Sequence, residues 1–236
     1  MSAFAGQLAL VTGASRGIGA ATAEALAAAG AHVVLTARDA KALETVEERI
    51  FAAGGQATIA PVDLAESDGI ARLAAAISGR WPALDIMVHA AAVLPQLTPV
   101  GDIDQGSFSK AITANVLATQ ALIGAFGPLL KISSDARLIY LTSSVATEPR
   151  AYWGAYAASK AAAEVLVDCY AQEVRNTSAI RVAIVDPGAT RTAMRARAYP
   201  GEDPASVKPP EEVAARLVAL LGEQFSSPHR ERVNQS

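Results

Sequence analysis

Residues 8–19 read LALVTGASRGIG, a short apolar run that ends in a turn with three glycines, and a helical pattern continues from Gly19 to Ala29. Gly13 permits a tight turn between strand and helix, Gly17 lets the backbone approach a phosphate, and Gly19 lets the helix pack against the strand. The start of such a helix presents free N–H groups and about half a unit of positive charge. This stretch therefore predicts a phosphate-binding strand–helix unit near the beginning of the chain.

The rest of the chain alternates between short β-branched runs and longer helical patterns, which implies right-handed crossovers and a parallel sheet. Residues 138–141 are apolar throughout, as expected where helices cover both faces of a sheet. We therefore expect a single α/β domain over residues 1–236, a doubly wound Rossmann-type fold with six to seven parallel strands and helices on both faces. The expected strands are Leu8–Thr12, His32–Thr36, Ala57–Pro61, Ile86–Ala90, Arg137–Thr142 and Arg181–Val185, and the other expected helices are Ala40–Ala53, Asp68–Ser78, Ser107–Leu130 and Ala155–Arg175.

The composition argues against several other classes of protein. The 236 residues are 51% hydrophobic, and a formal net charge of −3 without a basic run argues against nucleic acid as a partner. The N-terminal residues lack the pattern of a signal peptide, and no apolar run approaches the length needed to cross a bilayer, so we expect a cytoplasmic protein with no membrane partner. The single cysteine, Cys169, excludes an internal disulfide and is interpreted as a small buried residue in a reducing compartment.

A tyrosine and a lysine lie four residues apart on a predicted helix, at Tyr156 and Lys160, and therefore share one face of it. A free tyrosine has a pKa of about 10, too high for efficient acid–base chemistry near neutrality. A neighbouring ammonium favours the phenolate and lowers that pKa. Ser143 lies thirteen residues before Tyr156 at the end of a predicted strand, and the adjacent Ser144 competes with it for the role of a hydroxyl that polarises a carbonyl.

These features together resemble the short-chain dehydrogenase/reductase family. The turn has that family's Gly-x-x-x-Gly-x-Gly spacing, and the resemblance runs from about Leu8 to about Leu221. It implies an oxidoreductase that interconverts a carbonyl and an alcohol, with a catalytic tetrad of Asn115, Ser143, Tyr156 and Lys160. In the family the matching asparagine disrupts its helix and holds a water linked to the lysine, and the lysine binds the nicotinamide ribose.

The resemblance also implies NADP(H) as the cofactor. An acid at the end of the second strand selects NAD in Rossmann folds, but that position looks like Ala37, and Arg16 and Arg38 could clamp a 2′-phosphate. A shift in the register would instead make Asp39 the ribose acid. Asp63 matches the position that contacts adenine, and the segment after the sixth strand matches the one that caps the nicotinamide. The full set implied to bind cofactor is Gly13, Ser15, Arg16, Gly17, Ile18, Gly19, Arg38, Asp63, Leu64, Tyr156, Lys160, Pro187, Gly188, Ala189 and Thr192.

The chain departs from the family pattern at residues 89–92, at Ala146, which replaces a common glycine, and at the C-terminus. The usual Asn-Asn-Ala-Gly after the fourth strand is replaced here by residues 89–92, His-Ala-Ala-Ala, which puts local hydrogen bonding in doubt. His89 is interpreted as a structural histidine rather than an acid–base group or a ligand, because no second ligand lies at metal-binding spacing, so no metal is expected. The C-terminal residues are polar and charged, so the sheet is expected to have six strands, or seven with the last around Arg232–Asn234.

The sequence leaves the substrate open. A carbonyl reductase or alcohol dehydrogenase is the leading hypothesis, with a 3-oxoacyl-carrier-protein reductase and a non-catalytic dinucleotide sensor as alternatives. A loop near residues 191–210, similar to that of a bacterial subgroup of generic oxidoreductases, predicts a short lid. Apolar residues on the last two long helices predict a homodimer or homotetramer. Candidates for the lining of a small-molecule pocket are Leu94, Gln96, Tyr152, Trp153, Met194 and Tyr199.

Overall fold

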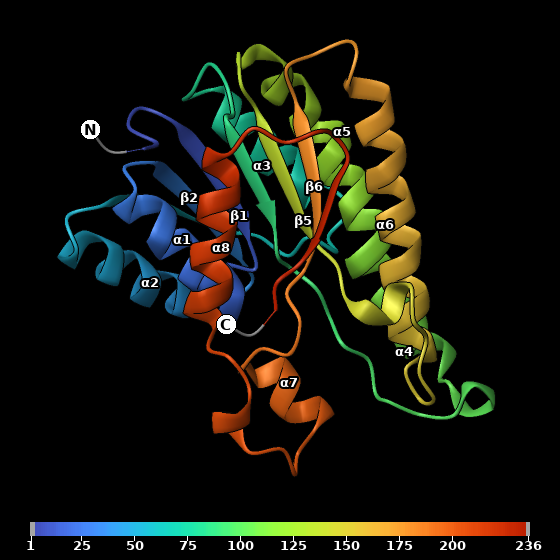
Figure 1. The fold of residues 1–236 in the computed structure, drawn as a ribbon. Coiled ribbons are helices and arrows are strands. Elements are labelled where there is room, and N and C mark those ends of the chain that lie inside the picture. The colour runs from blue at the N-terminus through green and yellow to red at the C-terminus, as the bar shows by residue number, and fades with distance from the viewer. Residues whose placement is uncertain (1–2, 235–236) are drawn as a thin grey trace.

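The computed structural model describes residues 3–234, which form a seven-stranded parallel sheet in the order β3-β2-β1-β4-β5-β6-β7. Figure 1 shows the sheet as the central layer with helices on both sides. The predicted α/β fold class is confirmed, and the six expected strands form within one residue of their expected ends. The strands are β1 Leu8–Thr12, β2 His32–Ala37, β3 Gln56–Pro61, β4 Ile86–His89, β5 Arg137–Leu141, β6 Arg181–Asp186 and β7 His229–Arg232.

Two apolar layers hold the helices to the sheet, because successive side chains of a strand point to opposite faces. One face packs under α1 (Gly17–Ala28), α2 (Ala40–Ala52) and α8 (Pro210–Gly222). The other packs under α3 (Gly69–Ser78), α5 (Ala118–Ile132) and α6 (Gly154–Val174). In β1, for example, Val11 enters the first layer and Leu10 the second, and both are fully buried.

Strands β1 and β4 are neighbours in the sheet. From β1 the chain adds β2 and β3 toward one edge, and from β4 it adds β5, β6 and β7 toward the other. In open α/β sheets, ligands bind at such a switch point, outside the carboxyl ends of the strands. The glycine turn follows β1 at this edge, and the segments that begin at Ala90 and Thr142 follow β4 and β5. The topology therefore gathers the predicted site residues at one edge of the sheet.

The expected long helix Ser107–Leu130 is interrupted. It consists of α4 (Gln105–Ile112), a π-helical turn η2 (Thr113–Leu117) and α5, with Asn115 inside the π turn. By length and composition the continuous run Gln105–Ile132 could cross a bilayer, contrary to the expectation that no run approaches that length. In this fold, however, Leu122, Phe126 and Leu130 of α5 are fully buried in the second apolar layer.

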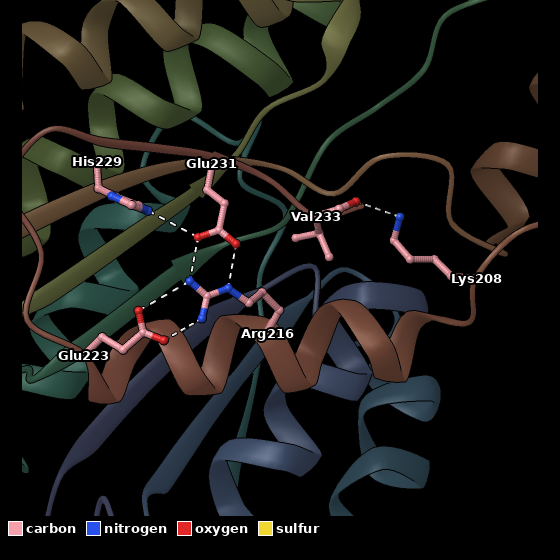
Figure 2. Close-up of polar contacts among 6 residues, drawn as sticks. All are labelled: Lys208, Arg216, Glu223, His229, Glu231 and Val233. Atoms are coloured by element: carbon pink, nitrogen blue, oxygen red, sulfur yellow. Dashed lines mark hydrogen bonds and ion pairs between the residues drawn. The ribbon is translucent and has the colours of Figure 1, made fainter. Parts of the chain in front are cut away.

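The seventh strand forms, but three residues earlier than expected, as β7 (His229–Arg232) in parallel pairing with β6. An apolar run is absent here because every residue of β7 is polar or charged, and ion pairs hold both of its faces. Arg230 pairs with Glu164 of α6, and Glu231 pairs with Arg216 of α8. Figure 2 shows the second of these pairs.

Two further features of the surface correct or refine the expectations. The side chain of Cys169 on α6 is exposed, so its interpretation as a buried residue is wrong. Residues 191–210 contain two short helices, α7 (Ala193–Ala198) and η4 (Pro204–Ser206), which project beyond the carboxyl edge of the sheet in Figure 1. The remaining short helices are η1 (Val100–Asp102) and η3 (Ser144–Ala146).

Candidate active site

The glycine turn is shaped by close backbone contacts. Gly13 has a φ of 68°, and a Cβ there would lie 2.9 Å from the Ala91 Cα, so any side chain would collide with the segment that follows β4. A Cβ at Gly19 would overlap the Gly13 carbonyl, which confirms that this glycine lets the helix approach the strand. Gly17, with a φ of 57°, faces Thr192, whose Cγ2 would lie 3.3 Å from an added Cβ.

This arrangement leaves a cradle bounded by backbone at the start of α1. Ser15 and Ile18 are half-buried in the same turn, and Ile18 also packs on the first apolar layer. Helix N-terminal N–H groups and glycines without side chains suit the close approach of a pyrophosphate. The residues present therefore fit the phosphate groups of a dinucleotide.

Two arginines flank the cradle. Arg16 and Arg38 are exposed, and neither guanidinium forms a hydrogen bond or ion pair with any residue among 3–234. Strand β2 ends at Ala37, and the Asp39 carboxylate accepts a hydrogen bond of 3.1 Å from the Ala42 backbone N–H as the N-cap of α2. Asp39 is therefore engaged in capping, while the two guanidinium groups are available to a phosphate.

The predicted adenine contact lies at the end of β3. The Asp63 Oδ1 atom accepts a hydrogen bond of 3.0 Å from the Ala65 N–H, which forms a tight turn at the carboxyl edge of the sheet. The neighbouring Leu64 is half-buried against the second apolar layer. Asp63 is thus held in place by its own turn.

His89 joins the glycine turn to the π turn through a buried chain of hydrogen bonds. Its Nδ1 lies 2.7 Å from the Thr12 hydroxyl and its Nε2 lies 2.9 Å from the Thr119 hydroxyl. Since Thr119 donates its only proton to the Asn115 carbonyl over 2.7 Å, the His89 Nε2 must carry the hydrogen. Burial, helped by the positive charge of Lys160, lowers the pKa of His89 to about 3. His89 is therefore a neutral, fully bonded structural residue, and it occupies the place of the family's amide side chains.

Asn115 uses its side chain to hold the segment after β4. Its Oδ1 accepts from the Val93 N–H over 2.8 Å, and its Nδ2 donates to the Val93 carbonyl and to the Ser159 hydroxyl, over 3.0 and 2.9 Å. Asn115 lies within the π turn, and the residue is 1% exposed. The expected disruption of the helix at Asn115 is thus seen, together with a link to the α6 residue that precedes Lys160.

Lys160 is buried beneath the end of β5. Its Nζ donates to the Leu141 carbonyl over 2.6 Å and lies 4.2 Å from the centre of the Tyr140 ring. Burial lowers the pKa of this amine to about 7, against the opposing effect of the Glu164 carboxylate one helical turn further along α6. Glu164 accepts a hydrogen bond from Thr142 and pairs with Arg230. The spacing of Tyr156, Lys160 and Glu164, four residues each, could have signalled this carboxylate in the sequence.

Tyr156 lies on the same helix but in an apolar setting. Its hydroxyl is 4.0 Å from the Met194 sulfur, and the ring of Trp153 packs edge-on against it with centroids 6.0 Å apart. Burial, and secondarily the charge of Asp186, raises the pKa of Tyr156 to about 12. In this structure the Lys160 amine bonds to the Leu141 carbonyl, and the direction of the shift in the Tyr156 pKa is opposite to the lowering expected from a neighbouring ammonium.

An apolar wall surrounds the Tyr156 ring. Trp153 also contacts the ring of Tyr199, with centroids 5.7 Å apart, whereas Tyr152 points outward and is exposed. Gln96 is exposed as well. The apolar cluster around Tyr156 comprises Leu94, Val145, Ala157, Leu97, Trp153, Met194 and Ala198.

The two serines after β5 differ in their contacts. The Ser144 hydroxyl accepts a hydrogen bond of 3.2 Å from Arg150, whereas that of Ser143 bonds to none of the described residues. Both line a polar cavity of about 280 Å³ between the ends of β5, β6 and β7. A larger cavity of about 430 Å³ lies at the opposite edge of the sheet, at the amino ends of β1, β2 and β3, away from every predicted site residue.

The segment after β6 completes the site. Gly188 has a φ of 65°, and its N–H donates to the Asp186 carboxylate over 2.9 Å. Pro187 is half-buried and Ala189 exposed, and the Thr192 hydroxyl accepts from the Arg195 N–H over 3.1 Å as the N-cap of α7. Its own proton stays available to a carboxamide. Asp186 and the buried Lys208, which bonds to Ala189, were missed because their roles depend on tertiary contacts.

No group of three or more His, Cys, Asp or Glu side chains is arranged to hold a metal ion within residues 3–234. What the described geometry brings together is a dinucleotide cradle and, beside it, a serine, a tyrosine and a lysine at one edge of the sheet. A buried tyrosine hydroxyl next to an apolar wall can exchange a proton with a bound carbonyl or alcohol.

Comparison with known proteins gives a consistent answer. The family described as short chain dehydrogenase matches residues 7–203. The uncharacterized oxidoreductase YciK of Escherichia coli (strain K12) is 37% identical over 217 residues, which cover 91% of this chain and 85% of that protein. A short chain dehydrogenase structure from Pseudomonas syringae is 38% identical with a TM-score of 0.93, covering 98% of this chain and 95% of that one. Another from Shigella flexneri 2a, complexed with NADP, is 35% identical with a TM-score of 0.92 and covers 98% of both chains. The chain belongs to the short-chain dehydrogenase/reductase family and is an oxidoreductase of it.

Proposed function

We propose that this protein is an NADP(H)-dependent oxidoreductase that interconverts a carbonyl and an alcohol. The observation that carries the proposal is a buried tyrosine, Tyr156, placed on the same helix as Lys160 and beside a glycine cradle that fits a dinucleotide. The NADP complex of the Shigella flexneri relative supports this choice of cofactor.

The cofactor would be held by the residues around the cradle. The turn that contains Gly17 would hold the pyrophosphate, Arg16 and Arg38 the 2′-phosphate, and Asp63 the adenine. Lys160 would hold the nicotinamide ribose, and the segment after β6 the carboxamide. When bound, NADP(H) supplies or accepts the hydride.

Tyr156 supplies the proton in the reducing direction. Because burial raises the pKa of Tyr156 to about 12, this hydroxyl keeps its proton throughout the neutral range and can donate it to the carbonyl oxygen. The Ser143 hydroxyl, which bonds to no residue among 3–234, donates a hydrogen bond to the same oxygen. The Lys160 amine, with a pKa lowered to about 7, titrates near neutrality and can return a proton to the tyrosine once it moves from the Leu141 carbonyl.

The substrate is expected to carry an apolar group next to its carbonyl. The wall around Tyr156 consists of aliphatic, thioether and indole side chains, and the Met194 sulfur lies at the tyrosine hydroxyl. A substrate must displace Met194 to reach that hydroxyl, so residues 191–210, which carry Met194, act as a short lid.

Replacing Tyr156 with phenylalanine tests the chemistry. General acid–base catalysis contributes about 10²–10⁴-fold, so kcat should fall by that order, while NADPH affinity, measured by fluorescence titration, should stay near wild type. Ser143→Ala should lower kcat more than Ser144→Ala, which serves as the matched control.

A folded Tyr156→Phe variant with near wild-type turnover would refute the assignment. A wild-type protein that binds NADPH but reduces nothing in a panel of ketones, aldehydes, quinones and acyl thioesters would favour a non-catalytic sensor.

Replacing Arg38 with alanine tests the choice of cofactor. Hydrogen bonds to charged groups contribute about 1.5–3 kcal/mol each, so the dissociation constant of NADPH should rise about tenfold or more. That of NADH, which lacks the 2′-phosphate, should stay nearly unchanged. An equal loss for both cofactors would contradict the role of Arg38.

A further inference from the structure

Lys208, which the family resemblance does not assign, is buried between the segment after β6 and the end of β7. Its side chain is 3% exposed, and its Nζ donates to the Val233 carbonyl over 2.9 Å and to the Ala189 carbonyl over 3.3 Å. Figure 2 shows the lysine side chain extended toward the Val233 carbonyl. The backbone is joined as well, because the Arg191 N–H donates to the Lys208 carbonyl over 2.8 Å.

The position of the ammonium depends on the glycine before Ala189. A Cβ added to Gly188 would lie 2.8 Å from both the Lys208 Nζ and the Val233 carbonyl oxygen. A side chain at residue 188 would therefore push the lysine away from its partners. The buried position of the Lys208 ammonium therefore requires a glycine at residue 188.

Burying an ammonium costs free energy unless hydrogen bonds compensate for the lost water. Lys208 is buried, so solubility, the usual role of a surface lysine, does not explain it. Burial lowers the pKa of Lys208, while the carboxylates of Asp186 and Glu212 act to raise it and the guanidinium of Arg232 acts to lower it. Asp186 also accepts the Gly188 N–H, and its carbonyl accepts the Val233 N–H over 2.9 Å. The same few groups thus fix both the loop and the end of the last strand.

We propose that Lys208 is a positioning residue that holds the Ala189 backbone in place for the nicotinamide end of the cofactor, using the C-terminal strand as its anchor. The inference rests on the proposed role of the segment 187–192 in binding the carboxamide. Val233, the residue after β7, supplies one of the two carbonyls that hold the ammonium. The end of the last strand therefore contributes to the orientation of the cofactor.

The test separates the two halves of the cofactor. In Lys208→Met, which keeps the length and apolar stem but removes the charge, we expect the KM for NADPH to rise about tenfold and kcat to fall. The affinity for 2′-phosphoadenosine 5′-diphosphoribose, which lacks the nicotinamide, should stay within about twofold of wild type. Hydride transfer from NADPH deuterated on one face should lose stereospecificity, which a general loss of stability would not cause. Lys131→Met, an exposed lysine at the far end of α5, is the matched control and should match wild type.

Wild-type KM and stereospecificity in a folded Lys208→Met variant would overturn the inference. If that variant does not fold, Lys208→Gln, which keeps a shorter polar side chain but removes the charge, is the second variant, and the same raised KM with unchanged fragment affinity is expected. A wild-type KM in Lys208→Gln would overturn the inference equally. A wild-type protein that binds neither NADPH nor the fragment would instead refute the proposed function, so the two failures are distinguishable.

Discussion

At the scale of single residues, the burial and hydrogen bonds of Lys160 and Tyr156 determine the protonation of the site. Lys160 and Tyr156 share a helix face, as their spacing predicts, yet the lysine amine bonds to the Leu141 carbonyl and the tyrosine hydroxyl faces Met194. Catalysis as proposed needs the two groups to come together. The pKa values of the two side chains, lowered for the lysine and raised for the tyrosine, both follow from burial.

His89 should make the fold sensitive to acid. Its pKa of about 3 lies below the ordinary value of 6.5, so between these values the unfolded chain binds one proton more than the folded chain. The stabilisation is fully present above about pH 6.5 and is lost as the pH falls toward 3, by about 1.4 kcal/mol per pH unit. In His89→Asn, the free energy of unfolding from urea titrations should fall less steeply between pH 6 and pH 4 than in wild type.

The comparison of the two proteins at pH 7 supplies the control for this prediction, because the histidine is neutral there in the folded state and the variant carries no titrating group at residue 89. Any difference at pH 7 measures lost packing and hydrogen bonding alone. Parallel slopes in wild type and His89→Asn would show that His89 does not titrate as its burial requires.

At the scale of elements, the least predictable part of the sheet is its last strand. The strands β1 to β6 each contain apolar or β-branched residues that mark them as strands, whereas β7 consists of His229, Arg230, Glu231 and Arg232. Its stability comes from charged partners on α6 and α8. Arg216 of α8 is central, because its guanidinium binds Glu231 with two hydrogen bonds of 2.5 and 2.7 Å and also pairs with Glu223 (Figure 2).

Arg216→Ala should loosen β7. The Glu231 side chain, which is 20% exposed, would lose its bidentate partner, and we expect the free energy of unfolding to fall by about 1–2 kcal/mol. Hydrogen exchange of the β7 amides should become faster than in wild type. Arg72→Ala is the matched control, because Arg72 also joins two carboxylates, those of Glu66 and Asp68, but on an exposed surface, where ion pairs contribute little. Equal losses in the two variants would contradict a special role for Arg216.

At the scale of the whole molecule, an apolar surface on one side of the fold remains uncovered. Helices α5 and α6 lie side by side (Figure 1), and α6 exposes Ala162, Val165 and Cys169 at helical spacing. Leu117, the last residue of the π turn that precedes α5, is also exposed. Exposed apolar residues on paired helices suit a two-fold symmetric contact, so we propose that two copies associate through this surface.

Val165→Asp should therefore separate the subunits. A carboxylate at a two-fold interface faces its own copy in a desolvated setting, which costs association free energy. Light scattering at micromolar concentration should give twice the chain mass for wild type and a single-chain mass of 24.3 kDa for the variant. Val100→Asp places the same charge on an even more exposed valine of η1 and should leave the dimer intact. A wild-type mass of one chain would refute the association.

Much of this molecule follows from its sequence alone. The positions of the first six strands along the chain, the glycine turn after β1 and the common face of Tyr156 and Lys160 depend on local properties, namely hydrophobic period, glycine stereochemistry and helical spacing. Only the tertiary structure decided that β7 forms, that His89 bridges two turns and that Lys208 is buried beside Ala189. These outcomes depend on polar contacts between segments far apart in the chain, such as Arg230 with Glu164 across 66 residues, and such contacts leave no periodic pattern in a sequence.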